Sequence, residues 1–158
     1  MLSSTPQSEN WVPVMTGENK PYSVTRAGHI VIRVRDPEAT AAFFKDVVGF
    51  NHKGVVQRGM YFLTSDFDEN HHMLLIRPAK PGAAAQDRDT AIGMARVSFE
   101  MRDAARFDAA VAKLLEKGIA PQLDAGGGRK SVRFHDFDGL PFEFWCRVPA
   151  DSNTGAAA

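Results

Sequence analysis

The sequence predicts an α+β protein built from two βαβββ units in one chain. A strand-like stretch at residues 28–36 is followed by an amphipathic helix and three short strands, and the same order recurs later in the chain. The pair Arg35-Asp36 recurs as Arg102-Asp103, 67 residues later, and the Asp-Phe-Asp pattern of residues 66–68 recurs at 136–138, 70 residues later. Two shared patterns in the same order indicate an internal duplication.

The first unit begins with a strand predicted at residues 28–34, where apolar and polar residues alternate. Asp36 is the expected N-cap of the next helix, and Pro37 suits its first position because the missing N–H is not needed there. Gly49 is the expected stop. The apolar residues of this helix share one face: Phe43, Phe44, Val47 and Val48. Three short strands are predicted after it, at residues 50–56, 59–64 and 72–77.

The second unit follows a linker at residues 79–92, which is rich in proline, glycine and alanine. Its first strand is predicted at residues 96–101, and Asp103 is the expected cap of a helix that stops at Gly118. The apolar face of that helix consists of Phe107, Ala110, Val111, Leu114 and Leu115. Three more strands are predicted at residues 119–123, 131–135 and 141–146.

These elements define one domain at residues 27–148, with modules at 27–78 and 93–148. Residues 1–26 form an N-terminal extension whose apolar cluster, around Trp11, is expected to dock on the domain or on a second subunit. Residues 149–158 lack periodicity and are expected to be a flexible tail.

The composition favours a compact domain that binds a small molecule. Hydrophobic residues make up 44% of the 158 residues, enough for a core. Lys plus Arg and Asp plus Glu number 19 each, so no net charge favours nucleic acid or an anionic membrane. The single Cys146 lies in an apolar strand, which indicates an inert core thiol. With no signal peptide or membrane-spanning run, a cytoplasmic location is expected.

Three segments carry a resemblance to a known family: GHIVIRVRDPEATAAFFKDVVGF at 28–50, FLTSDFDENHHMLLI at 62–76 and SVRFHDFDGLPFEFWC at 131–146. They resemble the vicinal oxygen chelate superfamily, which includes glyoxalase I, fosfomycin and bleomycin resistance proteins, methylmalonyl-CoA epimerase and extradiol dioxygenases. The resemblance spans about residues 27–147. It implies that the paired modules form one curved, partly open, barrel-like mixed sheet with flanking helices, around a divalent metal.

In this superfamily the metal ligands come from the first and last strands of each unit. The resemblance therefore implies a metal site formed by His29, His72 and Glu143. Arg96 occupies the fourth position and cannot be an ordinary ligand, because its guanidinium group has no free lone pair. Two imidazoles and one carboxylate leave coordination positions open on Fe(II), which is the favoured ion, with Mn, Zn or Ni as alternatives.

The position of the second histidine depends on the alignment of the two units. A gapless match places Met73 opposite Glu143, and a shift of one residue places His72 there. Strand alternation decides whether His71 or His72 points inward, and His72 is preferred. The His71-His72 pair also resembles that of extradiol dioxygenases, in which the second histidine is an acid-base catalyst. This implies a catalytic role for His72.

Three arginines near the implied cavity suggest an anionic substrate such as a carboxylate, an enolate or a phosphorylated compound. They are Arg96, Arg129 and Arg133, and Arg96 is also expected to orient the substrate during catalysis. One alternative is that Arg129 and Arg133 face solvent. Another is a buried ion pair between Glu143 and Arg96, which would fill the metal position in a metal-free binding protein.

The leading functional hypothesis is a metal-dependent enzyme similar to extradiol dioxygenases, acting on a small catechol-type or anionic substrate. A glyoxalase- or epimerase-type isomerase or lyase is the first alternative. A metal-free small-molecule binding or resistance protein is the second. The resemblance, together with the apolar cluster of the N-terminal extension, also suggests a homodimer.

The remaining candidate residues are expected to be structural. His135 precedes Asp136 and is expected in a turn or at a rim, and His52 is expected in solvent. The run Gly126-Gly127-Gly128 lacks the Lys-Ser/Thr that completes a phosphate-binding loop, so it is expected to be a flexible turn or a substrate-loop hinge.

Overall fold

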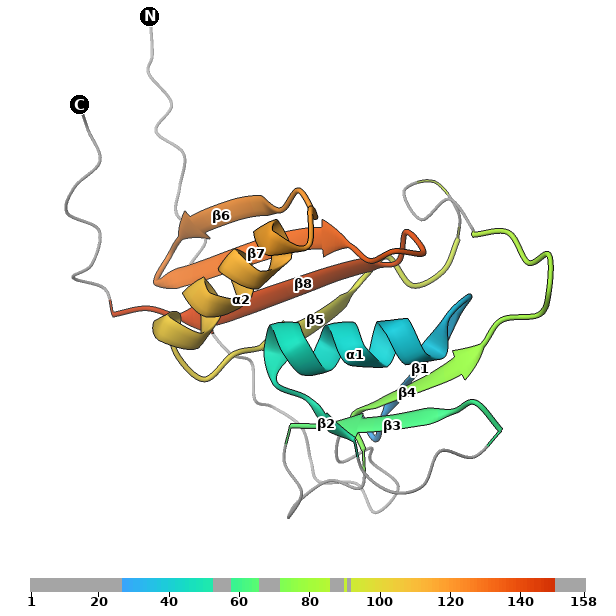
Figure 1. Ribbon diagram of the computed structural model, residues 1–158. Coiled ribbons are helices and arrows are strands. Elements are labelled where there is room, and N and C mark those ends of the chain that lie inside the picture. Colours follow the sequence, from blue (N-terminus) through green and yellow to red (C-terminus); the bar gives the residue numbers. More distant parts are fainter. Residues whose placement is uncertain (1–26, 53–57, 66–71, 86–89, 91, 150–158) are drawn as a thin grey trace, which may run out of the picture.

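The first module is a four-stranded mixed sheet with one helix (Figure 1). The computed structural model describes residues 27–52, 58–65, 72–85, 90 and 92–149 of the chain. The first module contains β1 (Ile30–Val34), α1 (Pro37–Val48), β2 (Asn51–His52), β3 (Tyr61–Thr64) and β4 (Leu74–Pro78). Its strand order is β1-β4-β3-β2, in which β1 and β4 are parallel and the other pairs are antiparallel.

The second module repeats this arrangement. It contains β5 (Val97–Glu100), α2 (Ala104–Glu116), β6 (Gln122–Gly126), β7 (Arg129–His135) and β8 (Pro141–Arg147). The strand order is β5-β8-β7-β6, again with one parallel pair between the first and last strands. The predicted α+β class and the paired βαβββ modules are therefore confirmed. Strand pairing separates the described strands into two sheets rather than one continuous curved sheet.

Both helices begin at the predicted caps. The Asp36 side chain accepts a hydrogen bond from the backbone N–H of Ala39 at 3.0 Å, and the Asp103 side chain accepts one from Arg106 at 2.8 Å. These bonds satisfy N–H groups that have no partner within the helix. After α1, Gly49 adopts a left-handed φ of 71°, which glycine tolerates without a steric penalty.

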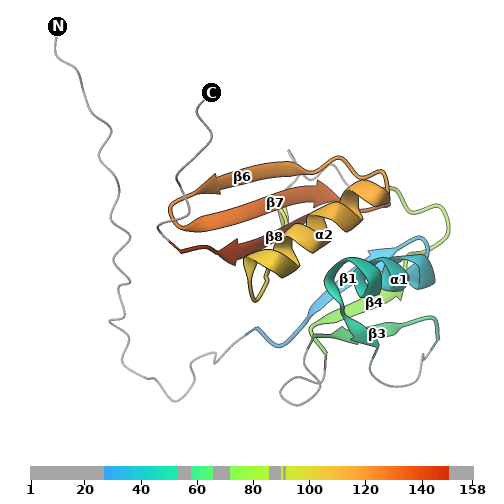
Figure 2. The ribbon, with the colours of Figure 1, turned by 60° about the vertical axis from the view of Figure 1, so that its left-hand side comes forward.

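An aromatic core joins the two modules. The rings of Phe44 on α1 and Phe142 on β8 lie 5.0 Å apart in an edge-to-face arrangement, and those of Phe50 and Phe99 lie 5.4 Å apart. Phe44 and Phe142 are almost completely buried. The two helices also contact each other, and they lie close together in Figure 1 and Figure 2. The modules therefore share one core instead of folding as separate domains.

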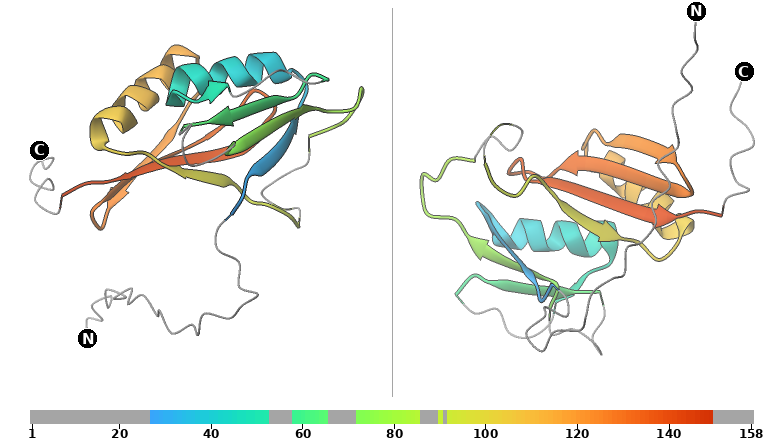
Figure 3. Two further views of the ribbon diagram at one scale, coloured as in Figure 1. Left: turned by 90° about the horizontal axis from the view of Figure 1, so that it is seen from below. Right: turned by 180° about the vertical axis from the view of Figure 1, so that it is seen from behind.

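The helices cover only one side of the sheets, as Figure 3 shows from below and from behind. Burial alternates along β1 and β5, the first strand of each sheet, because successive side chains point to opposite faces. Ile32 and Val34 of β1 are buried, whereas Val31 and Arg33 between and beside them are exposed. We call the side away from the helices the open face. It carries Arg33 of β1, Arg133 of β7 and Glu143 of β8, whereas Lys130 of β7 reaches Asp108 of α2 on the helix side.

The turn between β7 and β8 also connects the modules. Asp138 accepts a hydrogen bond from the backbone N–H of Arg35 at 2.8 Å and pairs with the Arg35 guanidinium at 2.9 Å. Asp136 shapes the turn, because its Oδ1 accepts hydrogen bonds from the backbone N–H groups of Asp138 and Leu140. Burial raises the pKa of Asp136, and those two hydrogen bonds only partly oppose the shift.

Two boundary predictions differ from the structure. A strand follows α2 as predicted, but it is shifted toward the C-terminus: β6 begins at Gln122 and runs to Gly126 instead of spanning residues 119–123. Gly127 and Gly128, with φ of 59° and 75°, then form a two-residue turn into β7, so the glycine run is a tight hairpin. The strand predicted at residues 50–56 is described only over Asn51–His52, since residues 53–57 lie outside the described part.

Two histidines and the single cysteine lie where the sequence predicts. His52 and His135 are exposed, as predicted, and Cys146 is buried, with burial raising the pKa of its thiol. Within the described chain, none of the helices is long and apolar enough to cross a membrane. The N-terminal extension, the tail at 150–158, and His71 lie outside the described residues.

Replacing Phe44 by alanine should lower the free energy of unfolding by about 3–5 kcal/mol, because it removes a buried ring at the contact between the modules. Urea denaturation followed by circular dichroism measures this change. Leu123→Ala is the matched control, since Leu123 is exposed on β6 and its loss should cost less than about 0.5 kcal/mol. Equal losses in both variants would contradict a shared core at Phe44.

Candidate anion site on the open face

Glu143 is a buried carboxylate at the centre of the second sheet. It lies in the middle of β8 and is only 4% exposed. Strand register places it between Ser98 on β5 and Arg133 on β7, and all three side chains lie on the open face. A buried carboxylate needs compensating charge or hydrogen bonds.

Three arginines and one hydroxyl group surround this carboxylate. Oε1 lies 3.2 Å from Nη2 of Arg129 and 3.6 Å from Nε of Arg133. Oε2 lies 3.6 Å from Nε of Arg96 and accepts a hydrogen bond from Oγ of Ser98 at 2.8 Å. Both oxygens of Glu143 are therefore occupied. We call Arg96, Arg129, Arg133 and Glu143 the arginine cluster.

The arginine cluster carries an excess of positive charge, since one carboxylate faces three guanidinium groups. Burial alone would raise the pKa of Glu143. The Ser98 hydrogen bond and the three guanidinium groups outweigh burial, and together they hold this pKa below its ordinary value. Glu143 is consequently ionised at neutral pH. Its single charge cannot neutralise all three arginines, and the cavity beside them keeps an excess of positive charge even with Asp124, the other carboxylate of its lining.

The cluster forms one wall of a cavity of about 300 Å³. The arginine side chains are between 43 and 48% exposed, so their guanidinium groups remain accessible beside the buried carboxylate. Arg129 also lies over the ring of Trp145, 4.6 Å from the ring centre, which restricts its orientation. The other lining residues are Asp124, Ala125, Gly126 and Ser131. The cavity therefore presents several oriented cationic donors to a small ligand.

His29 and His72 lie together in the first module. His29 is exposed just before β1, and His72 precedes β4. Their ring centres are 4.4 Å apart, and the ring of Phe62 packs edge-on against His72 at 5.1 Å. The structure thus brings the two predicted imidazoles into contact, on the sheet that does not contain Glu143.

Strand register corrects the alignment of the two units. Val31 pairs with Leu75 across the parallel strands of the first sheet, and Ser98 pairs with Glu143 in the second. Val31 and Ser98 correspond in the repeat, so Leu75 is the counterpart of Glu143. Neither His72 nor Met73 occupies that position. The sequence alignment placed them there because the two units differ in length between the Asp-Phe-Asp pattern and the last strand.

Residues 26–144 match the family described as the Glyoxalase/Bleomycin resistance protein/Dioxygenase superfamily. The chain belongs to this superfamily. The resemblance of the three sequence segments is therefore confirmed at the level of the family, while the superfamily's many reactions leave the activity open. No curated protein matches the chain in the corresponding comparison.

Solved structures of the superfamily share the fold. A glyoxylase/bleomycin resistance protein/dioxygenase domain from Frankia sp. EAN1pec has a TM-score of 0.66 and 16% identity, covering 81% of this chain and 96% of its own. A glyoxalase/dioxygenase from Nostoc punctiforme has a TM-score of 0.64 and 21% identity, covering 84% of this chain and 98% of its own. The fosfomycin resistance protein FosX from Listeria monocytogenes, complexed with Mn(II) and sulfate ion, has a TM-score of 0.61 and 17% identity. The match covers 80% of this chain and 93% of that protein.

FosX from Listeria monocytogenes is a superfamily member solved with Mn(II), and the corresponding question here is whether His29, His72 and Glu143 can hold a metal. Among the described residues, no three or more His, Cys, Asp or Glu side chains gather closely enough to hold one. Glu143 already has guanidinium or hydroxyl partners on both oxygens. Within one chain, His29, His72 and Glu143 therefore do not fit a metal as a set. The ion pair between Glu143 and Arg96, predicted as the alternative, is present.

Two residues in contact with the arginine cluster, Ser98 and Trp145, are not predicted from the sequence. Ser98 lies two residues after Arg96, and Trp145 lies two residues after Glu143. Since alternate residues of a strand share one face, the period of two would have found both once Arg96 and Glu143 were chosen. Their contacts cannot be predicted from the period alone, because each contact crosses to a neighbouring strand: Ser98 of β5 contacts Glu143 of β8, and Trp145 of β8 contacts Arg129 of β7.

Glu143→Gln should destabilise the protein at about pH 7 by about 1–2 kcal/mol, because three guanidinium groups lose their shared counter-charge. The lowered pKa of Glu143 means that its stabilisation is present above the ordinary carboxyl pKa and is lost as the pH falls through the folded-state pKa. The difference from wild type should therefore shrink in acid. Urea denaturation across the pH range measures it.

Glu100→Gln is the control for that comparison. Glu100 is a carboxylate on β5 of the same sheet, but its pair with Arg147 is exposed, so its loss should cost less than about 1 kcal/mol. A difference between wild type and Glu143→Gln that stays constant into acid would show that the Glu143 charge does not stabilise the cluster.

Proposed function

We propose that this chain binds a small anionic molecule at the arginine cluster, as a metal-free small-molecule binding or resistance protein of its superfamily. The observation that carries the proposal is the contact of one buried carboxylate with three guanidinium groups beside a cavity. A carboxylate, phosphate or related oxyanion would supply the negative charge that Glu143 alone does not.

The cluster is preorganised for this binding. Glu143 holds Arg96, Arg129 and Arg133 near one another, although their mutual repulsion would otherwise separate them. Trp145 restricts Arg129 further. A ligand therefore meets donors that are already ordered, which lowers the entropy cost of binding.

The three arginines of the cluster would contact the ligand in different ways. Arg129 and Arg133 approach the same oxygen of Glu143 and would bind the ligand as a pair, through N–H groups that the carboxylate does not use. Arg96 approaches the other oxygen and would orient the ligand from the β5 side. This is the substrate-orienting role expected for Arg96 from the sequence.

Arg129→Ala and Arg133→Ala should each weaken the binding of inorganic phosphate by about tenfold or more, because each removes a charged donor. Arg102→Ala is the matched control, since Arg102 is an exposed arginine at the start of α2 and should leave binding unchanged. Isothermal titration calorimetry measures the affinities. Unchanged phosphate binding in both cluster variants would refute the site.

Glu143→Gln separates anion binding from metal binding at the same residue. The glutamine keeps one oxygen that accepts hydrogen bonds from the guanidinium groups, so part of the arrangement of the arginines is retained while the competing charge is removed. Phosphate binding should therefore strengthen by several-fold, whereas a metal held by Glu143 would be lost. The titration is made at about pH 7, where the wild-type carboxyl is ionised. Weaker phosphate binding in Glu143→Gln would contradict charge competition.

A divalent-metal-dependent function is the second candidate. It is favoured by the contact between His29 and His72, which supplies two imidazole donors, and by the Mn(II) complex of the Listeria relative. Fe(II) is the ion proposed for a dioxygenase-like reaction, and glyoxalase- or epimerase-type chemistry is the alternative. The acid-base role proposed for His72 is an alternative to metal binding by that residue, because a ring nitrogen bound to the ion cannot also exchange a proton. The homodimer and the cytoplasmic location also stay predictions.

Metal analysis of the purified protein distinguishes this second candidate. A histidine-held metal should be present at about one per chain and should fall by at least about tenfold in both His29→Ala and His72→Ala. His52→Ala is the control, because His52 is an exposed histidine of β2 in the same sheet. Metal content unaffected by both substitutions would rule out the histidine pair as its site.

A further inference from the structure

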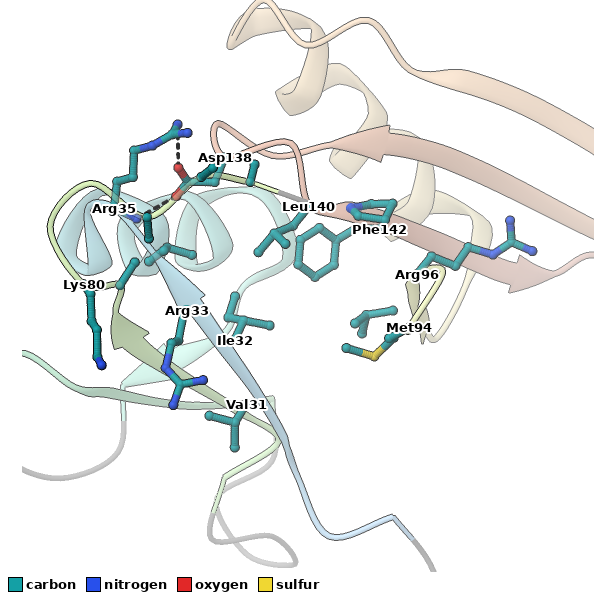
Figure 4. Close-up of a pocket in the computed structure, with 17 residues that line it drawn as sticks. Val31, Ile32, Arg33, Arg35, Lys80, Met94, Arg96, Asp138, Leu140 and Phe142 are labelled. Atoms are coloured by element: carbon teal, nitrogen blue, oxygen red, sulfur yellow. Dashed lines mark hydrogen bonds and ion pairs between the residues drawn. The ribbon is translucent and has the colours of Figure 1, made fainter. Parts of the chain in front are cut away.

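A larger cleft lies between the two modules, apart from the arginine cluster. Its volume is about 690 Å³, within the range of cavities that enclose small organic ligands. Figure 4 shows β1 on one side of the cleft and residues of β5 and β8 on the other. The segment that follows β4, including Lys80, closes one end. Both modules therefore contribute to it.

The floor of the cleft is apolar. Leu140 and Phe142 lie between β1 and Met94 in Figure 4, and Phe142 is buried beneath the cavity. Val31 and Met94 line the cleft while remaining 42 and 50% exposed. These two side chains would lose contact with water if an apolar group bound against them.

The charged groups of the cleft are mostly cationic. Its lining contains Arg33, Arg35, Lys80 and Arg96, but Asp138 is its one carboxylate, and Arg35 already pairs with it at 2.9 Å. Neither Arg33 nor Lys80 forms an ion pair with another described residue. In Figure 4 these two side chains extend in the same direction, opposite to Arg35.

Arg96 separates this cleft from the arginine cluster. It lines both cavities, and its Nε lies 3.6 Å from Glu143. In Figure 4 its guanidinium group points away from Leu140 and Phe142. The Arg96 stem therefore faces the cleft, while its charged end belongs to the cluster. The cationic groups left for a ligand in the cleft are those of Arg33 and Lys80.

We propose that this cleft is a second ligand site, which takes a small amphipathic anion with an aromatic or branched aliphatic body and one carboxylate. The body would cover Val31, Met94 and Leu140, and the carboxylate would bind Arg33 and Lys80. Apolar contact alone would admit neutral compounds equally well, and charge alone would admit inorganic anions. Selectivity for a molecule with both features follows from the two kinds of lining on one cavity.

The test uses 2-naphthoate as the probe, in calorimetric titrations of the full chain, with 2-naphthol and inorganic phosphate for comparison. Wild-type protein should bind naphthoate at one equivalent and more tightly than naphthol. Arg33→Ala and Lys80→Ala should each weaken naphthoate binding by about tenfold, through loss of a charged donor. Phosphate binding at the arginine cluster should not change in either variant.

Val31→Asp tests the apolar wall with a side chain that is already partly exposed. Its carboxylate would repel naphthoate and pair with Arg33, so binding should be lost while the fold is retained. Leu123→Asp, an equivalent change at an exposed leucine of β6, should leave naphthoate binding intact. Circular dichroism and urea denaturation confirm that both variants fold.

The same titrations distinguish this site from the proposed function. Arg129→Ala should weaken phosphate binding by about tenfold or more and leave naphthoate binding unchanged, so the two sites can fail separately. Naphthoate binding that survives Arg33→Ala, Lys80→Ala and Val31→Asp would overturn the second site. So would naphthoate binding that is lost in Arg129→Ala, because it would place the probe in the arginine cluster. Absence of naphthoate binding to wild type would also overturn it.

Discussion

The packing of Phe44 against Phe142 is the contact on which the arrangement of the molecule depends. It joins a helix of the first module to the last strand of the second, in a core that neither module completes alone. Because this core lies on the helix side, the opposite side of both sheets remains open. The inter-module cleft and the arginine cluster both follow from this one-sided coverage, since each needs strand residues that no helix covers.

Charge on the open face is arranged around one buried carboxylate. Glu143 is stabilised as an anion by Ser98 and three arginines, and in turn it keeps those arginines close together. The balance is incomplete, because three arginines line a cavity that contains two carboxylates, Glu143 and Asp124. An incomplete balance beside a cavity is the electrostatic condition that favours an anionic ligand. The same engagement of both carboxylate oxygens makes Glu143 a poor metal ligand within one chain.

Much of the local structure could be predicted from the sequence. The two helices begin at the predicted caps, Asp36 and Asp103, because capping depends on residues only three positions apart. The strand expected at residues 119–123 starts too early. Residues 119–121 suggest a strand because they are apolar, but they precede β6, which begins at Gln122. The hairpin at Gly127 and Gly128 sets the position of β6, since a two-residue turn determines which residues pair across it.

The site was only partly predictable for a related reason. Glu143 can be recognised in the sequence because a carboxylate in an apolar strand needs a partner, and Arg96 is one partner that the sequence predicts. Arg129 and Arg133 were expected either at the cavity or in solvent, and strand pairing places them beside Glu143. Alternation shows which residues share a face, but it does not show which strands are neighbours.

By itself, the sequence determined the superfamily, the duplicated βαβββ plan, the helix caps and the candidate charged residues. These depend on local spacing and on repeated patterns, which are visible along the chain. Only the tertiary structure decided that Glu143 contacts three arginines, that Leu75 is its counterpart in the first module, and that His29 and His72 meet away from it. Those outcomes depend on strand register and on packing between distant segments, where a shift of a few residues changes every contact.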